Sequence, residues 1–345
     1  MTSLQPIGAS ELLDRLAGGL DTTGAFVDEP VVVVTIDDAD PRDLARLSNL
    51  LAPAPVVVIG VADDPGAAEG VDRLGGFDVL LAGRDHDLHP WVDARFLDPI
   101  TEAVRANPSA AVTMAQLLRV GASASASDAI VAESWVYSLL QSGAEHRAWL
   151  DARVDRERRP RPDRPVVILE RDGSELHITL DRPEVRNAYG TRMRDELVEA
   201  LELVDLDPSI DRAIVRGNGP GFCSGGDLDE FGTAPAPVSA HLVRTSRNAG
   251  IVLTRVADRV EFRVHGACVG AGVELPAFCS RVFATPDATF RLPEIAMGLV
   301  PGAGGTSSIP RRIGRHRTAV MALLGAPIDA TTALQWGLID GIDAP

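Results

Sequence analysis

The chain has 345 residues, of which 45% are hydrophobic, so it is long enough to bury one large core or two smaller ones. Its 33 basic and 49 acidic residues leave a formal net charge of −16, which argues against nucleic acid or an anionic membrane as a general partner. The three cysteines form an odd set without metal-ligand spacing, which favours a reducing compartment over a disulfide framework.

The apolar segments of the chain are short. Met1 to Ala9 has no basic region, and runs such as Val31 to Val34 and Val56 to Val61 are far shorter than the ~20 residues of a membrane span. We therefore expect a cytoplasmic protein that does not enter a membrane.

The segment before Pro99 has an α/β pattern. The runs Val31 to Ile36, Val56 to Gly60 and Phe77 to Leu81 are apolar and rich in β-branched residues, as in buried strands. Pro41 to Leu51, between the first two runs, is typical of a helix. This alternation predicts a parallel sheet.

Helices are expected after the sheet, with natural stops at Gly121 and Gly143. The expected ranges are Ile100 to Asn107, Ser109 to Val120, Ser127 to Ser142 and Ala144 to Arg156. Val154 to Pro165 then carries several arginines and three prolines, and we interpret it as an interdomain linker. Phosphate binding by these arginines is the less favoured alternative.

A second α/β unit follows the linker. Val166 to Glu170 and Leu176 to Leu180 flank a hairpin signal, Arg171 to Ser174. Thr191 to Leu206 has the apolar spacing of an amphipathic helix. The stretch Gly232 to Pro237 is interpreted as either a mobile lid or an ordinary surface loop.

Two Gly-rich segments each follow a strand-like run and precede a helix. The first, Gly217 to Asp227, follows Ile214 to Arg216, and the second, His265 to Leu275, follows Val260 to Val264 and contains Glu274. Because such turns leave backbone amides uncovered, they can bind an anion or an oxygen that becomes anionic during a reaction. A purely structural turn is the alternative.

A second acid, Glu294, precedes a third Gly-rich turn, Pro301 to Thr306, which we expect to support Glu294 and to start a helix. Two amides from separate turns suit the carbonyl oxygen of a thioester, which gains charge as an enolate forms. Two acids suit proton transfer. Taken singly, Glu274 and Glu294 could each be a helix-capping residue.

Motifs between Asp181 and Asp340 follow the order and spacing of one known family. They are Asp181 to Ala188, Phe222 to Leu228, His265 to Leu275, Phe290 to Glu294 and Gly298 to Thr306. Through them the segment resembles the crotonase (enoyl-CoA hydratase/isomerase) superfamily. The resemblance implies a core of repeated β-β-α turns, an acyl-CoA thioester as substrate and a homo-oligomer, either a trimer or a hexamer. It implies no metal and no redox cofactor, because coenzyme A is part of the substrate.

The resemblance also implies a role for particular residues. The oxyanion hole would be the amides of Gly226 and Ala271, and Glu274 and Glu294 match the two glutamates of true hydratases. Their joint presence favours hydration, with Glu274 activating water for attack at Cβ and Glu294 delivering the proton to Cα. The two roles could be exchanged between Glu274 and Glu294, because two acids that interact strongly titrate as a pair.

Five residues fall where the family lines its coenzyme A site: Arg186, Asn187, Ala188, Gly225 and Asp227. The guanidinium of Arg186 could pair with a phosphate. For Asp227 a cap or turn role is the structural alternative.

The chain departs from the family pattern at its two ends. In the family a helical module follows the equivalent of Trp336 to Asp340, whereas here Ile100 to Arg156 resembles that module and precedes the core. Val33 to Asp43 is also weakly similar to Leu176 to Asn187. We therefore expect an internal duplication, in which residues 1–160 form a degenerate crotonase-like α/β and helical domain. Residues 161–345 form the catalytic core.

The expected fold class is thus α/β, a crotonase-like superhelix core preceded by a smaller α/β and helical domain. The expected activity is that of an enoyl-CoA hydratase-like lyase, in either direction. The rivals are double-bond isomerisation, cofactor-free oxygenation like that of dihydroxyphenylacetyl-CoA dioxygenases, and a non-catalytic acyl-CoA-binding subunit. Retention of Glu274 and Glu294 weighs against all of them.

Overall fold

The computed structural model describes residues 5–17, 29–37, 39–64, 74–83, 89–153, 163–234 and 236–343. Most of the arginine-rich linker lies outside these residues, as does one residue of the expected lid. None of the described helices is long and apolar enough to cross a membrane.

The N-terminal sheet is parallel and its strands pair in chain order. Its strands are β1 (Ile7–Gly8), β2 (Val31–Thr35), β3 (Val57–Ala62), β4 (Val79–Ala82) and β5 (Val92–Asp93). Helices α1 (Ala9–Ala17) and α3 (Pro41–Leu51) pack together beside the sheet. The predicted parallel sheet is confirmed, and α3 has the predicted bounds.

The two faces of this sheet belong to different hydrophobic cores. Alternate residues of a strand point to opposite faces, so Val57 and Ile59 join the main core whereas Val58 joins a smaller core under α1 and α3. The main core also contains most of the buried apolar residues that follow position 163. The expected boundary near residue 160 therefore divides the chain but not its main core.

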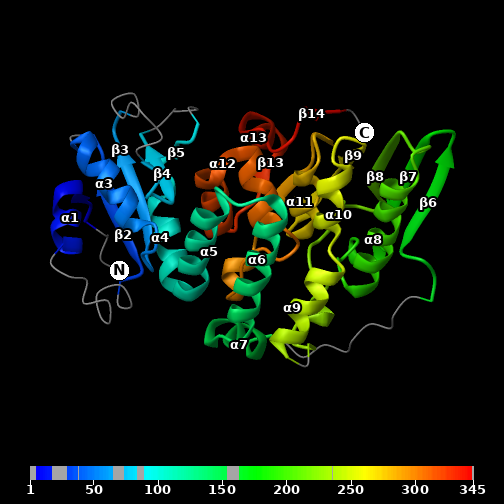
Figure 1. Ribbon diagram of the computed structural model, residues 1–345, viewed down its shortest axis with the longest axis horizontal. Helices are drawn as coiled ribbons and strands as arrows, with labels where there is room; N and C mark the ends of the chain where they lie inside the picture. Colours follow the sequence, from blue (N-terminus) through cyan, green and yellow to red (C-terminus); the bar gives the residue numbers. More distant parts are fainter. Residues whose placement is uncertain are drawn as a thin grey trace.

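Four helices lie between the N-terminal sheet and the rest of the molecule (Figure 1). They are α4 (Leu97–Ala106), α5 (Pro108–Gly121), α6 (Ala126–Gln141) and α7 (Ala144–Asp151), and we call them the helical module. The helix α6 begins one residue before the expected Ser127, and Ser125 caps it: its Oγ accepts a hydrogen bond from the amide of Asp128 at 3.1 Å. The module contacts α9, α10 and α12 of the C-terminal half.

The C-terminal sheet has the order β14-β11-β9-β8-β7-β6, and all its pairs are parallel except the β6–β7 hairpin. Gly173, with φ of 59°, makes the hairpin turn that the sequence predicts. The strands are β6 (Val167–Asp172), β7 (Glu175–Leu180), β8 (Arg212–Gly217), β9 (Val260–Val264), β11 (Arg281–Ala284) and β14 (Gly341–Ile342). A smaller sheet joins β10 (Ala267–Val269), β12 (Thr289–Arg291) and β13 (Ile328–Asp329).

Helices connect these strands and cover the sheets. They are α8 (Thr191–Leu206), α9 (Pro237–Ser246), α10 (Ala249–Val256), α11 (Ala271–Glu274), α12 (Gly305–Leu324) and α13 (Ala330–Trp336), with 3₁₀ turns at η4 (Pro183–Val185), η5 (Leu228–Glu230), η6 (Pro276–Phe278) and η7 (Glu294–Met297). A further 3₁₀ turn, η3 (Ala94–Phe96), joins β5 to α4. The bend in α12 lies at Gly314, whose φ of 76° and ψ of 156° are not helical. The mixed α/β architecture, with an α/β region ahead of the core, agrees with the predicted fold class.

Candidate active site

The first two Gly-rich segments lie side by side and are hydrogen-bonded to each other. The amide of Phe222 donates to the carbonyl of His265 at 2.9 Å, and that of Cys223 donates to Ala267 at 3.2 Å. In the other direction, the amide of Val269 donates a hydrogen bond to the carbonyl of Cys223 at 2.9 Å. This short ladder brings the ends of the two segments together.

The two amides predicted to form an oxyanion hole follow this ladder directly. Among the described residues, neither the amide of Gly226 nor that of Ala271 donates a hydrogen bond. Ala271 begins α11 after Gly270, whose φ of 50° and ψ of −116° suit only glycine. Ala271 itself is not among the described residues with positive φ, so alanine fits there without strain. Both amides also border the cavity described below.

Glu274 is the last residue of α11 and its side chain is buried, with 2% of the residue exposed. Its Oε2 accepts hydrogen bonds from the amides of Ala303 at 2.7 Å and Gly305 at 2.9 Å. Burial raises the pKa of Glu274 to about 7, and these amide bonds act in the opposite direction. The third Gly-rich turn therefore binds Glu274, a contact that the sequence did not predict, and it leads into α12 as predicted.

Glu294 begins η7, and its carboxyl group differs from that of Glu274 in its hydrogen bonds. Its Oε2 is buried and has no hydrogen-bond partner among the described residues. Burial and the charge of Glu274 raise the pKa of Glu294 well above its ordinary value. A Cβ atom built on Gly270 would lie 2.7 Å from Glu294 Oε1 and 3.7 Å from Glu274 Oε1. The two carboxyl groups thus face one point, and only glycine leaves that point free.

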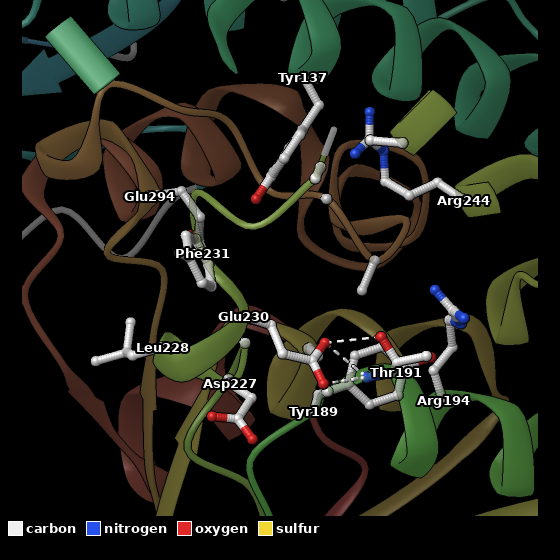
Figure 2. Close-up of a pocket in the computed structure, with 18 of the residues that line it drawn as sticks. Tyr137, Tyr189, Thr191, Arg194, Asp227, Leu228, Glu230, Phe231, Arg244 and Glu294 are labelled. Carbon is white, nitrogen blue, oxygen red and sulfur yellow. Dashed lines mark hydrogen bonds between the residues drawn. The ribbon is translucent and has the colours of Figure 1, made fainter. Parts of the chain in front are cut away.

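A cavity of about 560 Å³ opens in front of these groups, a size that suits a small organic ligand. Gly226, Ala271, Glu274 and Glu294 all line it. Figure 2 shows the side chain of Tyr137 between those of Glu294 and Arg244, across from Glu230 and Thr191. The predicted site residues are therefore brought together around one space.

Helix α6 of the helical module forms one wall of this cavity. Tyr137 and Gln141 both line it, and the Tyr137 ring covers Gly302, where an added Cβ would lie only 2.5 Å from the ring. The guanidinium of Arg244 lies over the same ring, 4.5 Å from its centroid. Residues from before and after the linker thus close the cavity within one chain.

The residues predicted to line the coenzyme A site separate into two groups. Gly225 and Asp227 line the cavity, and Asp227 also forms a 2.5 Å ion pair with Arg182. Asp227 caps η5 as well, which agrees with its structural alternative. Arg186, Asn187 and Ala188 are not among the residues that line the cavity.

Asn187 has a structural role. It is fully buried, its Oδ1 accepts from the amide of Arg182 at 2.8 Å, and its Nδ2 donates to the carbonyls of Asn218 and Phe222 at 2.9 and 3.0 Å. Its side chain therefore holds the first Gly-rich segment in place, and its polar atoms are already used within the protein.

Sequence reasoning missed Tyr137 and Glu133. Glu133 is 2% exposed and accepts hydrogen bonds from the amides of Gly304 at 2.7 Å and Thr306 at 2.8 Å. A charged residue within the apolar run Ala129 to Val136 was the available signal, since glutamate is seldom buried without partners. The described residues contain no group of three or more potential metal ligands.

Comparisons with known proteins point to one family. Residues 170–345 match the family described as enoyl-CoA hydratase/isomerase. The 2,3-dehydroadipyl-CoA hydratase of Escherichia coli is 36% identical over 176 residues, which are 51% of this chain and 68% of that protein. The 1,2-epoxyphenylacetyl-CoA isomerase of Escherichia coli is 36% identical over 168 residues, 48% of this chain and 64% of that protein.

A solved structure of an enoyl-CoA hydratase from Mycobacterium smegmatis is 30% identical, with a TM-score of 0.49, over 53% of this chain and 71% of that one. The two Escherichia coli relatives are matched over about two thirds of their length, 68% and 64%.

Proposed function

The chain belongs to the enoyl-CoA hydratase/isomerase family, the crotonase superfamily, and we propose that it adds water across the 2,3 double bond of a 2-enoyl-CoA, or removes it in reverse. The substrate is an acyl-CoA thioester, and the proposal uses no metal or redox cofactor. The observation that carries it is the pair of buried carboxyl groups, Glu274 and Glu294, which face one point beside two open amides.

The open amides would bind the thioester carbonyl. When water adds at Cβ, negative charge moves onto the carbonyl oxygen, and the amides of Gly226 and Ala271 can donate to it. Because they are held by the ladder between the two Gly-rich segments, they need little reorganisation. Donors of this kind each contribute roughly 3 to 4 kcal/mol to transition-state stabilisation.

The surroundings of the two acids support different roles. Two amides donate to Glu274 Oε2 and favour its ionised form, which suits the group that takes a proton from water. Glu294 lacks such donors at Oε2 and has a strongly raised pKa, which suits the group that keeps a proton and delivers it to Cα. We therefore assign Glu274 as the water activator and Glu294 as the proton donor.

Double-bond isomerisation is the second candidate, because the relatives include proteins named as isomerases. It would use the same two amides and needs a proton to be removed at one carbon and returned at another. The presence of two acids, both at the reacting position, favours hydration, in which one acid handles water and the other handles the substrate proton. Oxygenation and a purely binding role use neither acid in this way.

The test is to incubate the full chain with several 2-enoyl-CoAs in H₂¹⁸O and to follow the absorbance of the conjugated thioester. Hydration predicts loss of this absorbance and a product that carries the label, whereas isomerisation incorporates no label. Glu274→Gln and Glu294→Gln should each lower the rate by about 10²- to 10⁴-fold. Binding without turnover in the wild type would contradict the proposal.

A matched control is Glu230→Gln. Glu230 also lines the cavity, but its carboxylate accepts hydrogen bonds from the amide and hydroxyl of Thr191. We expect this variant to keep hydration within about tenfold of the wild type.

We further propose that the protein forms a homotrimer or homohexamer and resides in the cytoplasm. Support for self-association comes from exposed apolar side chains on the adjacent helices α6 and α9, where Trp135 and Leu139 are 61% and 63% exposed and Val238 and Leu242 are 69% and 61% exposed. Sedimentation equilibrium tests the assembly, and a monomer at micromolar concentration would contradict it.

A further inference from the structure

Residues 303–306, which lead into α12, are bound by two glutamates, one from each half of the chain. The amides of Ala303 and Gly305 donate to Glu274, at 2.7 and 2.9 Å. The amides of Gly304 and Thr306 donate to Glu133, at 2.7 and 2.8 Å, and the Thr306 hydroxyl adds a bond of 2.7 Å. Successive amides therefore alternate between the two carboxyl groups.

This arrangement is unusual for a helix N-terminus. The first amides of a helix have no partner within the helix, and one capping side chain together with water normally satisfies them. Here two acids share the same turn, and both residues are only 2% exposed. Two like charges so placed repel each other, although both are attracted by the positive end of the helix dipole.

Glu133 lies on α6, four residues before Tyr137, which lines the cavity. Through Glu133, the helical module is therefore hydrogen-bonded to the turn whose other amides bind Glu274. Without Glu133, the amides of Gly304 and Thr306 would be buried without an acceptor. This cost in free energy would favour a different position of the turn. Any such movement would also shift the amides that hold Glu274.

We propose that Glu133 is a positioning residue for Glu274: from the helical module it fixes residues 303–306, whose amides bind Glu274, and through its charge it opposes ionisation of the second acid, Glu294. The catalytic part of this inference rests on the proposed hydratase function. The effect on protein stability does not.

The titration of the pair is consistent with this geometry. Burial, and then the charge of Glu274, raise the pKa of Glu133 to about 8, while burial raises that of Glu274 to about 7. The pair therefore carries fewer than two full charges near neutral pH. Other titratable or charged groups act on the pair from the neighbouring elements: Tyr137 on α6, Arg244 on α9, Glu294 on η7, and Tyr189 and Cys223 in the loops beside the cavity.

The first test is the pH dependence of kcat/KM for Glu133→Gln. Glutamine keeps the shape and one acceptor oxygen but removes the charge, so Glu294 should ionise more easily. The pKa of Glu274, about 7, lies below that of Glu133, about 8, so Glu274 loses its proton while Glu133 is still mostly protonated, and its titration should change little. We expect the alkaline limb of the pH profile, which reports Glu294, to shift to lower pH by roughly half a unit or more, while the acid limb stays in place. A lower rate at every pH without any shift of the limbs would overturn the charge effect.

Three further variants sharpen this test. Glu133→Asp keeps the charge, so the limbs should stay near those of the wild type while the rate falls. Thr306→Val removes one hydrogen bond that favours ionised Glu133 and should give a smaller shift in the same direction as Glu133→Gln. Glu145→Gln is the matched control, because Glu145 accepts from the amides of Ser109 and Ala110 at the start of α5. Its limbs should not move.

The second test needs no substrate. Because the pKa of Glu133 is about 8 in the folded protein against an ordinary 4.5, the folded state binds more protons than the unfolded state between these values. The stability that this group contributes is therefore complete below pH 4.5 and is lost as the pH rises through about 8. Urea midpoints from about pH 5.5 to about pH 8.5 should decline less in Glu133→Gln than in the wild type.

The two tests separate this inference from the proposed function. If the wild type hydrates no enoyl-CoA but Glu133→Gln flattens the pH dependence of stability, the function fails and the coupling stands. If Glu133→Gln and Glu145→Gln decline as steeply as the wild type, and the limbs do not move, the inference is overturned.

Discussion

The two main sheets of the molecule are built alike, yet among the described residues the cavity is lined by segments that follow the strands of the C-terminal sheet and by none from the N-terminal one. In each sheet, parallel strands pair in chain order, β1 to β5 in one and β7, β8, β9, β11 and β14 in the other. They differ in what happens to the amides that follow the strands. After β3, the amides of Asp63 and Asp64 donate to the carboxylate of Asp37 at 2.9 and 3.1 Å. After β8 and β9, the amides of Gly226 and Ala271 stay open.

A binding site therefore depends on the turns rather than on the sheet. At the end of β3, the carboxylate of Asp37 takes the place where an anion could otherwise bind. In the C-terminal sheet, glycines with positive φ keep side chains away from the equivalent amides, as at Gly225 and Gly270. The shared strand order is what an internal duplication would leave behind, and we retain that duplication as a proposal.

The largest expected contrast between the sheets comes from one substitution made in each. Gly270→Ala places a methyl group 2.7 Å from Glu294 Oε1 at a φ of 50°, so we expect hydration to fall by about 10²- to 10³-fold. Gly60→Ala in β3 meets Ile36 Cδ1 at 2.4 Å and Leu80 Cδ2 at 2.9 Å, which should cost roughly 1 to 3 kcal/mol of stability. Its rate per folded molecule should not change.

Steady-state kinetics and urea unfolding of both variants measure this contrast. Equal losses of activity per folded molecule in Gly60→Ala and Gly270→Ala would show that the two sheets do not differ in the way described.

The attachment of the N-terminal sheet depends on a buried ion pair. Arg119 of α5 and Asp78 are 4% and 1% exposed and lie 2.5 Å apart. Arg119→Met leaves Asp78 buried without its main partner and should lower the free energy of unfolding by roughly 3 to 5 kcal/mol. Activity per folded molecule should persist, because neither residue lines the cavity.

Arg105→Met is the control for this prediction. Arg105 pairs with Glu29 at 3.3 Å on the surface, and such pairs contribute under about 1 kcal/mol. Comparable destabilisation of the two variants in urea would refute the special role of Arg119.

The smallest effect is expected at the wall formed by α6. Tyr137→Ala removes the ring that covers Gly302 and should raise KM roughly tenfold through lost apolar contact with the substrate. Trp135→Ala, two residues earlier and 61% exposed, should leave KM unchanged. A KM that responds equally to both changes would mean that α6 acts through stability alone.

Local sequence signals predicted local structure well. The bounds of α3 and α8 follow from Pro41 and Thr191 at the start of amphipathic runs, and the β6–β7 hairpin follows from Gly173. The motifs also identified Gly226, Ala271, Glu274 and Glu294 as residues that share one site, although they lie on separate segments.

Contacts between the two halves of the chain could not be predicted. Glu133 and Gly304 are 171 residues apart, and no local pattern links a helix interior to a distant Gly-rich turn. For the same reason, no local pattern indicates that the turn at 301–306 binds the side chain of Glu274. Nor does one indicate that Asn187 binds the amide of Arg182 and the carbonyls of Asn218 and Phe222.

The central claim is that the site belongs to both halves of the chain, and one measurement tests it most directly. Residues 161–345 are expressed alone, and their hydration rate is compared with that of the full chain at equal concentrations of soluble protein. We expect a loss of at least about a hundredfold, because the cavity loses Tyr137 and the turn that holds Glu274 loses Glu133. A soluble fragment that hydrates 2-enoyl-CoA at the full-chain rate would contradict the claim.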